Sequence, residues 1–423
     1  FCKGAVPEDC GIPLEKLEKL RHEFEYWYPY DLRVSGKDLI KNHLMMSLYI
    51  HQAIWPDMSK MPRAYFCNGH IQLNNEKMSK STGNFLTVDD AIKQFGADAT
   101  RFACADAGDS LDDANFAIAT ANAAILSLTT EEEFIRTVMS GELPTVEKPE
   151  AEYHFFDRNF VNEMNDCVRR CDQAYHDMRF RDALQIGFYE MQGIRNAYRD
   201  ACAKMDVPME KPLLARFAEL ECVMLAPIVP HFCDNIWRFV LGKTQNLWRN
   251  SWPEVPAVDA VLTRSIDFVR KNVRNLRESV NKKPKKAPAT WKRPNKVYVY
   301  CAREYHPWQQ FALRILQECY DANGKTLPAN VVSVVKERVG ASEEFKKQMK
   351  DILAFASFTV KTDFPQLGED AFTLEMPFDE KEVLDQCVHF IKKDCQLDDV
   401  QVFHAEDVNA PDPMNRKKDA KPG

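Results

Sequence analysis

A helical spacing of apolar residues between about residues 110 and 260 limits the possible fold more than any other feature of this chain. Val161, Met164, Val168, Cys171 and Tyr175 follow one another at steps of three and four residues. Such steps place side chains on one face of an α-helix, and other helices must cover that face. Breaks near residues 179–182 and at the prolines of "LAPIVPHF" divide the pattern. This region is therefore predicted to be a bundle of several helices.

The regions on either side of the predicted bundle mix helices and strands. Residues 14–28, 37–54 and 88–105 predict helices, and "DLRVSG" predicts a strand that ends at Gly36. "AYFCNGHIQL" predicts a β-hairpin that turns at Asn68-Gly69, since Asn-Gly is the strongest short hairpin signal. Beyond residue 296 we expect a small α+β domain. Its strands are "KVYVYCA", "FTLEMPF" and "DVQVFHA", and its helices are 307–323, 342–357 and 379–394.

The predicted fold class is therefore multidomain, α/β followed by all-α. Five parts are expected: an α/β part at 1–108, a helical domain at 109–263, a basic helix and linker at 264–295, an α+β domain at 296–407 and a disordered tail at 408–423.

Charge is distributed unevenly along the chain. The whole chain carries −7, but residues 264–296 contain twelve Lys and Arg against Asp267 and Glu278, a net of +10. A basic segment in an acidic protein is typical of a nucleic-acid contact or of a solvated linker, and charge alone leaves both open. Thirteen cysteines without regular spacing favour a reducing compartment over a disulfide framework. No apolar run is long enough for a membrane span.

The segment "NNEKMSKSTGNF", residues 74–85, which we call the lysine loop, places two lysines three residues apart among small polar residues. A solvated surface loop is the simplest interpretation. Its predicted position, between a hairpin and a helix of an α/β unit, is also where such folds bind ligands. Two flexible ammonium groups suit a triphosphate, and Gly83 would let the loop bend over it. Lys80 is the leading candidate for a functional residue.

"KMSKS" in this loop is also a signature of class I aminoacyl-tRNA synthetases, and the resemblance extends beyond it. "FEYWYPYDLRVSGKDLIKNHL" and residues 68–116 resemble leucyl-tRNA synthetases of the archaeal and eukaryotic cytosolic type. "LAPIVPHFCDNIW" resembles the proline-linked helix pair of their anticodon-binding bundle, with Asp234 where the family usually has Glu. The resemblance runs from about residue 15 to about residue 405 and is most specific between 24 and 116.

This resemblance implies a fold and an activity. The fold would be the second half of a class I Rossmann-like nucleotide fold, a helical anticodon-binding bundle and a small α+β C-terminal domain. The activity would be that of a leucine–tRNA ligase, which activates leucine with ATP and Mg²⁺ to leucyl-adenylate and transfers it to tRNA(Leu). A cytoplasmic location is implied, with no membrane contact and no protein-bound metal. Association with a larger synthetase complex is left open.

The resemblance also implies roles for residues. Lys77 and Lys80 match the motif lysines and would neutralise the phosphates as pyrophosphate leaves. The expected ATP-binding residues are Lys80, Met78, Ser79, Ser81, Gly36 and Asp38. His43, a helical turn beyond Asp38, is a candidate for the substrate pocket, with packing as the alternative. Asp38 also has a competing interpretation as a helix N-cap, because it lies near a predicted helix start.

One family element is missing from the sequence. The His-x-Gly-His motif that meets the ATP phosphates is not found, nor is the inserted editing domain. We therefore expect residue 1 to lie just after that insertion, and this chain alone to be weakly active or inactive.

Two sets of arginines are candidates for tRNA phosphates, with a solvated charged face as the alternative. They are Arg169, Arg170, Arg179 and Arg181 in the predicted bundle, and Arg270, Arg274 and Arg277 beside the apolar stripe of the next helix. Shape and backbone contacts are expected rather than base readout.

Two other functions compete with a leucine–tRNA ligase. A methionyl or other class Ia synthetase is the nearer one, although "WYPYDLRVSG" and "STGN" favour leucine. A non-catalytic tRNA-binding or scaffold protein derived from a synthetase is the other, and the missing His motif motivates it.

Overall fold

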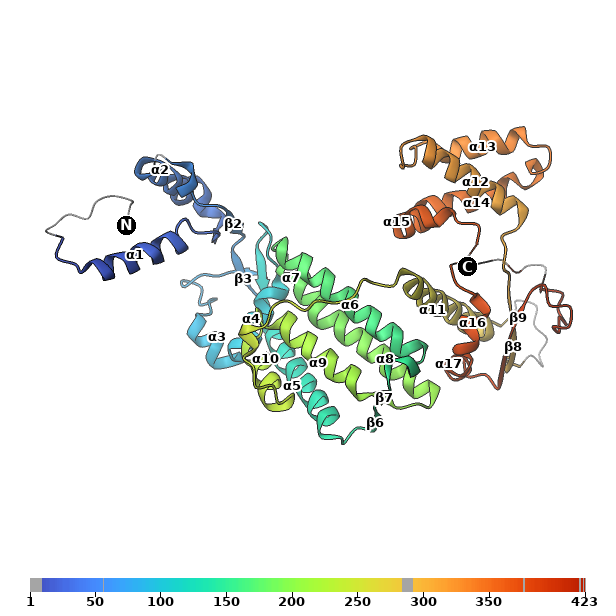
Figure 1. The fold of residues 1–423 in the computed structure, drawn as a ribbon, viewed down its shortest axis with the longest axis horizontal. Coiled ribbons are helices and arrows are strands. Elements are labelled where there is room, and N and C mark those ends of the chain that lie inside the picture. The colour runs from blue at the N-terminus through green and yellow to red at the C-terminus, as the bar shows by residue number, and fades with distance from the viewer. Residues whose placement is uncertain are drawn as a thin grey trace. The chain divides into compact units, whose positions relative to one another are not determined.

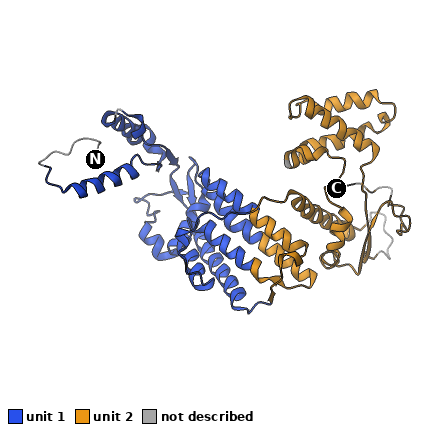
Figure 2. Ribbon diagram, viewed as in Figure 1, with its two compact units in different colours: residues 1–144, 166–193, 214–255 blue, residues 145–165, 194–213, 256–423 orange. Residues whose placement is uncertain are grey.

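The computed structural model describes residues 10–55, 57–283, 292–375, 377–417, 420 and 422. The chain divides into two compact units, shown in Figure 2, and each is described here by itself. The first takes residues 1–144, 166–193 and 214–255, and the second takes residues 145–165, 194–213 and 256–423. A mixed α/β part and a helical part are both present, while the five predicted domain boundaries stay predictions.

The first unit begins with helix α1 (Leu14–Trp27) and a two-stranded parallel sheet (Figure 1). Strand β1 (Arg33–Gly36) pairs with β2 (Tyr65–Asn68), so that Gly36 lies opposite Asn68 where both strands end. The segment between them contains η1 (Lys37–Leu39), η2 (Ile40–Leu44), α2 (Met45–Ile54) and η3 (Met58–Lys60). Parallel strands joined through a helix form a βαβ-type unit, whose strand ends commonly bind ligands.

The predicted hairpin at Asn68-Gly69 is wrong. Strand β3 (Ile71–Leu73) does not pair with β2 but with β5 (Ala114–Phe116) in parallel and with β4 (Glu76–Lys77) in antiparallel fashion. The hairpin turn is Asn74-Asn75, whose φ angles of 52° and 66° are those that a type I′ turn requires. Gly69 has a different role: a Cβ there would lie 2.0 Å from the Asp112 carbonyl oxygen.

The helix expected from Val88 to Ala105 is two helices, α3 (Val88–Phe95) and α4 (Ala97–Ala107). Gly96 separates them with a φ of 82°, a conformation that suits glycine at a helix end. The Thr87 hydroxyl accepts the Asp90 backbone N–H at 3.1 Å and caps α3. The lysine loop therefore leads directly into a capped helix.

Helix α4 also contacts the turn that "LAPIVPHF" forms. The Asp98 carboxylate accepts the backbone N–H of Phe232 at 2.6 Å, and Arg101 donates to the carbonyls of Pro227 and Ile228 at 2.6 and 2.8 Å. These bonds use polar groups that the prolines leave without helical partners. The turn is thereby joined to the helix that follows the lysine loop.

The bundle predicted for residues 110–260 is helical as expected, and its apolar stripe is buried. Met164, Val168, Cys171, Leu184 and Phe188 are each at most 1% exposed. The break in the pattern corresponds to Met178, whose φ is 57°. The elements are α5 (Ile118–Ser140), α6 (Phe155–His176), α7 (Phe180–Leu184), η5 (Gln185–Glu190), α8 (Met191–Met205), α9 (Lys211–Leu225), α10 (Pro230–Asn235), η6 (Ile236–Val240) and η7 (Leu247–Arg249). No helix among the described residues is long and apolar enough to cross a bilayer.

The second unit contains helix α11 and two small parallel sheets. α11 (Ala260–Asn281) is capped by Asp259 and buries the predicted stripe, including Ile266, Val269 and Val273. Strands β6 (Thr145–Val146) and β7 (Met209–Glu210) pair, as do β8 (Lys296–Cys301) and β9 (Asp399–His404). The predicted linker falls largely outside the described residues.

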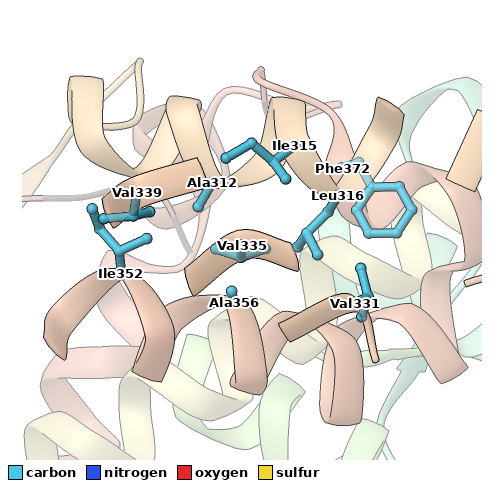
Figure 3. Packing of buried hydrophobic residues seen from close by; sticks show 9 residues of the cluster. All are labelled: Ala312, Ile315, Leu316, Val331, Val335, Val339, Ile352, Ala356 and Phe372. Atoms are coloured by element: carbon cyan, nitrogen blue, oxygen red, sulfur yellow. The ribbon is translucent and has the colours of Figure 1, made fainter. Parts of the chain in front are cut away.

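Between β8 and β9 lies a helical cluster whose apolar core is shown in Figure 3. Ile315 and Leu316 pack with Val335 and Ile352 from two other helices. The predicted strand "FTLEMPF" is wrong for the described part of that segment, because Phe372 packs into this core instead. The helical elements that lie between β8 and β9 in the sequence are α12 (Pro307–Ala322), α13 (Val331–Ala341), η8 (Lys346–Gln348), α14 (Met349–Phe358), η9 (Thr359–Asp363), α15 (Phe364–Leu367), η10 (Gly368–Phe372), α16 (Glu380–Gln386) and α17 (Val388–Asp394). The short η4 (Glu150–Glu152) comes earlier in the chain, between β6 and α6.

Candidate functional site

The lysine loop is a short hairpin arm followed by a tight turn. Lys77 ends β4, and the Ser79 backbone N–H donates to the Asn84 carbonyl at 2.9 Å, which closes the loop. The Ser79 and Ser81 hydroxyls lie 2.8 Å apart, and Gly83 has a φ of 74°. The polar side chains thus hold the backbone in place, and the lysine side chains take no part in it.

Lys77 and Lys80 are exposed, and neither forms an ion pair with any residue that the structure describes. Met78 and Ser79 between them are half-buried. An ammonium group that is already paired must lose its partner before it binds a phosphate. These two lysines avoid that penalty, as expected of groups that meet an anionic ligand.

Gly36 and Asp38 lie where β1 ends, as the sequence predicts. The Asp38 side chain folds over Gly36, because a Cβ at Gly36 would lie 2.6 Å from the Asp38 Oδ1. η1 has Gly36 as its N-cap residue and shows no capping side chain, so the N-cap interpretation of Asp38 gains no support. His43 is exposed, and its Nε2 contacts the Arg33 guanidinium.

Sequence reasoning missed three side chains around Asp38. Lys37 Nζ lies 2.7 Å from Asp113 Oδ1, and the His70 imidazole lies 3.4 Å from Asp38 Oδ1 through Nε2 and 3.7 Å from Asp113 Oδ1 through Nδ1. The hydrogen bond from Lys37, and then the one from the His70 backbone N–H, lower the pKa of Asp113. The signal in the sequence was a histidine two residues after the end of β2, but the predicted hairpin placed this histidine within a strand.

The arginines predicted to bind tRNA divide into two groups. Most are ion-paired: Arg170 with Asp166 and Glu190, Arg179 with Asp177 and Asp182, Arg270 with Glu163 and Asp267, and Arg277 with Asp394. Arg169, Arg181 and Arg274 are exposed and have no ion-pair partner among the described residues. The second group is therefore the better candidate for phosphate contacts.

His154, Asp157 and Cys202 bring three possible metal-ligand atoms within 4.8 Å of one another. The His154 Nδ1 accepts the backbone N–H groups of Phe156 and Asp157 at 3.1 and 3.2 Å, so the neutral ring carries its proton on Nε2, toward Asp157. A metal at Nε2 would leave both nitrogens unprotonated, and metal-bound histidines normally donate from the other nitrogen. Burial also raises the pKa of the Cys202 thiol to about 12. The geometry fits a helix cap better than a metal site.

Three family models match separate parts of the chain. Residues 14–127 match tRNA synthetases class I (M), residues 157–291 match the anticodon-binding domain of tRNA ligase, and residues 301–377 match the RagD-binding domain of leucine–tRNA ligase.

Curated proteins resemble the chain over nearly its whole length. Identity is 38% over 416 residues with the cytoplasmic leucine–tRNA ligase of Pongo abelii, 37% over 420 with that of Arabidopsis thaliana and 35% over 405 with that of Saccharomyces cerevisiae. These matches cover 96%, 96% and 94% of this chain but 34%, 38% and 36% of the relatives. The chain thus spans about a third of the length of the curated relatives it matches.

Proposed function

Because this chain belongs over nearly its whole length to the family of cytoplasmic leucine–tRNA ligases, we propose that it serves in the ATP-dependent attachment of leucine to tRNA(Leu) in the cytoplasm. The observation that carries this proposal is the lysine loop, whose Lys77 and Lys80 are exposed and have no ion-pair partner among the described residues. The proposed fold of residues 14–127 is the second half of a class I nucleotide fold, in line with the matched model.

In the proposed reaction the leucine carboxylate attacks the α-phosphorus of ATP, and pyrophosphate leaves. Negative charge grows on the departing phosphates, and Lys77 and Lys80 offset it without first breaking an ion pair. Mg²⁺ enters with the ATP. The leucyl group then passes to a hydroxyl at the 3′ end of the tRNA, and AMP is released.

The helical bundle would bind the sugar-phosphate backbone of the tRNA. Arg169 and Arg181 are exposed and free of ion pairs with described residues, so their guanidinium groups are open to phosphates. Residues 157–291 match an anticodon-binding model, which supports this assignment.

The decisive experiment is leucine-dependent pyrophosphate exchange, measured on this chain and on the full product of its gene, with methionine in parallel. We expect exchange with leucine in the full product, and a loss of about 10²–10³-fold with Lys80→Ala. Exchange with methionine would instead assign the chain to the methionine enzymes. If neither amino acid supports exchange while tRNA still binds, the non-catalytic alternative is correct.

We also infer a protein-docking role for residues 301–377, because the model they match is described as RagD-binding. Phe358, the last residue of α14 in this region, is 50% exposed. A RagD pull-down with the unsubstituted chain, with Phe358→Ala and with exposed Val408→Ala as the matched control tests this inference. If the unsubstituted chain and both variants retain equal amounts of RagD, Phe358 is not part of the interface.

A further inference from the structure

Four charged or polar side chains from three separate parts of the sequence meet at the ends of β1 and β2. Lys37 and Asp38 follow β1, His70 follows β2, and Asp113 precedes β5. Asp113 Oδ1 lies 2.7 Å from Lys37 Nζ and also accepts the His70 backbone N–H at 3.0 Å. The Asp113 carboxylate thus contacts both Lys37, which follows β1, and His70, which follows β2.

The backbone around Asp113 is held against the same strand ends. The Gly69 backbone N–H donates to the Ser110 carbonyl at 3.0 Å, and Lys37 Nζ donates to the Leu111 carbonyl at 3.0 Å. A side chain at Gly69 would overlap the Asp112 carbonyl, so this close approach requires glycine. Residues 110–113 are therefore fixed in position from two sides.

The charges in this group are not shared equally. Asp113 accepts the lysine ammonium and a backbone N–H, whereas among the described residues the Asp38 carboxylate has an ion-pair partner only in His70, whose Nε2 lies 3.4 Å away. The Asp38 side chain remains 57% exposed at the strand end. An exposed carboxylate beside an occupied one is the group left to receive donors from a ligand.

We infer that Asp113 is a positioning residue: it fixes Lys37 and His70 so that the Asp38 carboxylate receives the ribose hydroxyls of a nucleotide whose phosphates lie at the lysine loop. This inference rests on the proposed function, since it takes the lysine loop as the phosphate site. Two hydroxyls on adjacent ribose carbons match the two oxygens of one carboxylate.

Two probes separate the ribose contact from the phosphate contact. Mg²⁺–ATP carries both groups, whereas Mg²⁺–tripolyphosphate carries the phosphates alone. Binding of each to this chain is measured by calorimetry for the unsubstituted chain, Asp113→Asn, Asp38→Asn, the double variant and Asp112→Asn. Asp112 is the matched control, because it is exposed and its side chain has no hydrogen bond or ion pair with the described residues.

We expect Asp113→Asn and Asp38→Asn each to weaken ATP binding by about five- to tenfold, as befits hydrogen bonds to a charged group. The double variant should be no weaker than either single one, because both changes act through one contact. Tripolyphosphate binding should not change in any of them, and Asp112→Asn should match the unsubstituted chain for both probes. If Asp113 had a purely structural role, Asp113→Asn would weaken the binding of ATP and of tripolyphosphate together.

The possible failures are distinguishable. If Asp113→Asn binds ATP as tightly as the unsubstituted chain, or if ATP binds no tighter than tripolyphosphate, the inference is wrong and the phosphate site stands. If neither probe binds the unsubstituted chain, the phosphate site fails and the inference fails with it. Additive losses in the double variant would show that Asp113 acts independently of Asp38.

Discussion

The lysine loop and the arginines of the helical region both look basic in the sequence, but they differ in what surrounds each charge. Lys77 and Lys80 have no ion-pair partner among the described residues, whereas Arg170 and Arg277 each lie against a carboxylate. A paired cation adds to the stability of the fold, and an unpaired one is open to an anionic ligand. The count of basic residues therefore says little about binding until their partners are known.

The largest effect that tests this comparison is on phosphate binding at the lysine loop. Lys80→Ala should weaken Mg²⁺–tripolyphosphate binding at least about tenfold, since a charge-assisted contact is lost, and it should leave the unfolding midpoint unchanged. The control is Lys93→Ala, because Lys93 is also exposed but is paired with Asp89 at 2.5 Å. Calorimetry measures the affinity. Equal losses in the two variants would break the comparison.

A paired cation should behave in the opposite way. Asp394 is 5% exposed and contacts both Lys204, at 2.6 Å, and Arg277. Asp394→Ala leaves two cations without their carboxylate and should lower the free energy of unfolding by about 2 kcal/mol in urea. Phosphate binding at the lysine loop should be unaffected.

The same carboxylate gives a pH dependence with a definite sign. Burial would raise the pKa of Asp394, but the hydrogen bonds from Arg277 and Lys204 prevail and lower it. Its contribution to stability is therefore present above the unfolded pKa and is lost as the pH falls through the lower folded value. Unfolding midpoints should converge for the unsubstituted chain and Asp394→Ala in acid. A constant difference between the two would contradict this assignment.

A smaller effect is expected among the arginines themselves. Arg169→Ala and Arg181→Ala should each weaken tRNA binding and reduce the slope of log affinity against log salt by about one. Arg179→Ala should change the slope less, because that guanidinium already contacts Asp177 and Asp182. Filter binding at several salt concentrations measures both. If the paired arginine changed the slope more, ion pairing would not be the deciding property.

The smallest effect concerns His154, which is also engaged within the fold. Burial lowers its pKa below 6.5, although Asp157 opposes this, and protonation of Nδ1 would remove the cap of α6. The unfolded chain takes up the proton first, so stability should decline slightly as the pH falls below about 6.5. The neighbouring charges are Asp157, Lys148, Glu210 and Arg158. A His154→Asn variant, measured by urea unfolding, should lose this part of the decline; an unchanged pH profile would contradict it.

The sequence was sufficient where the period of apolar residues was long. The stripe from Met164 to Phe188 and the stripe of α11 are buried as predicted. A spacing of three and four residues that is repeated many times fits only a helix with one buried face. Short segments failed because tertiary pairing decided them. Asn68-Gly69 carries a strong turn signal, but β2 pairs with β1 and β3 with β5, so no hairpin forms there.

The candidate site shows the same division. The lysine loop was found from five neighbouring residues, whereas the group around Asp113 combines residues 37, 38, 70 and 113. No local pattern connects positions so far apart, because their proximity follows from the order of strands in the sheets. The ion-pair partner of Arg277 could not be predicted from the sequence either, because Asp394 lies 117 residues away.

The bonds from Asp98 and Arg101 to residues 227–232 have a consequence for thermodynamic linkage. Helix α3 starts directly after the lysine loop, α4 follows it, and α4 is bonded to the backbone of the bundle's turn. This covalent and hydrogen-bonded series connects the lysine loop to the turn at residues 227–232. By reciprocity, whatever factor a nucleotide in the loop applies to RNA affinity, RNA must apply to nucleotide affinity. If the bonds from Arg101 carry part of this coupling, an Arg101 substitution must change the two factors equally.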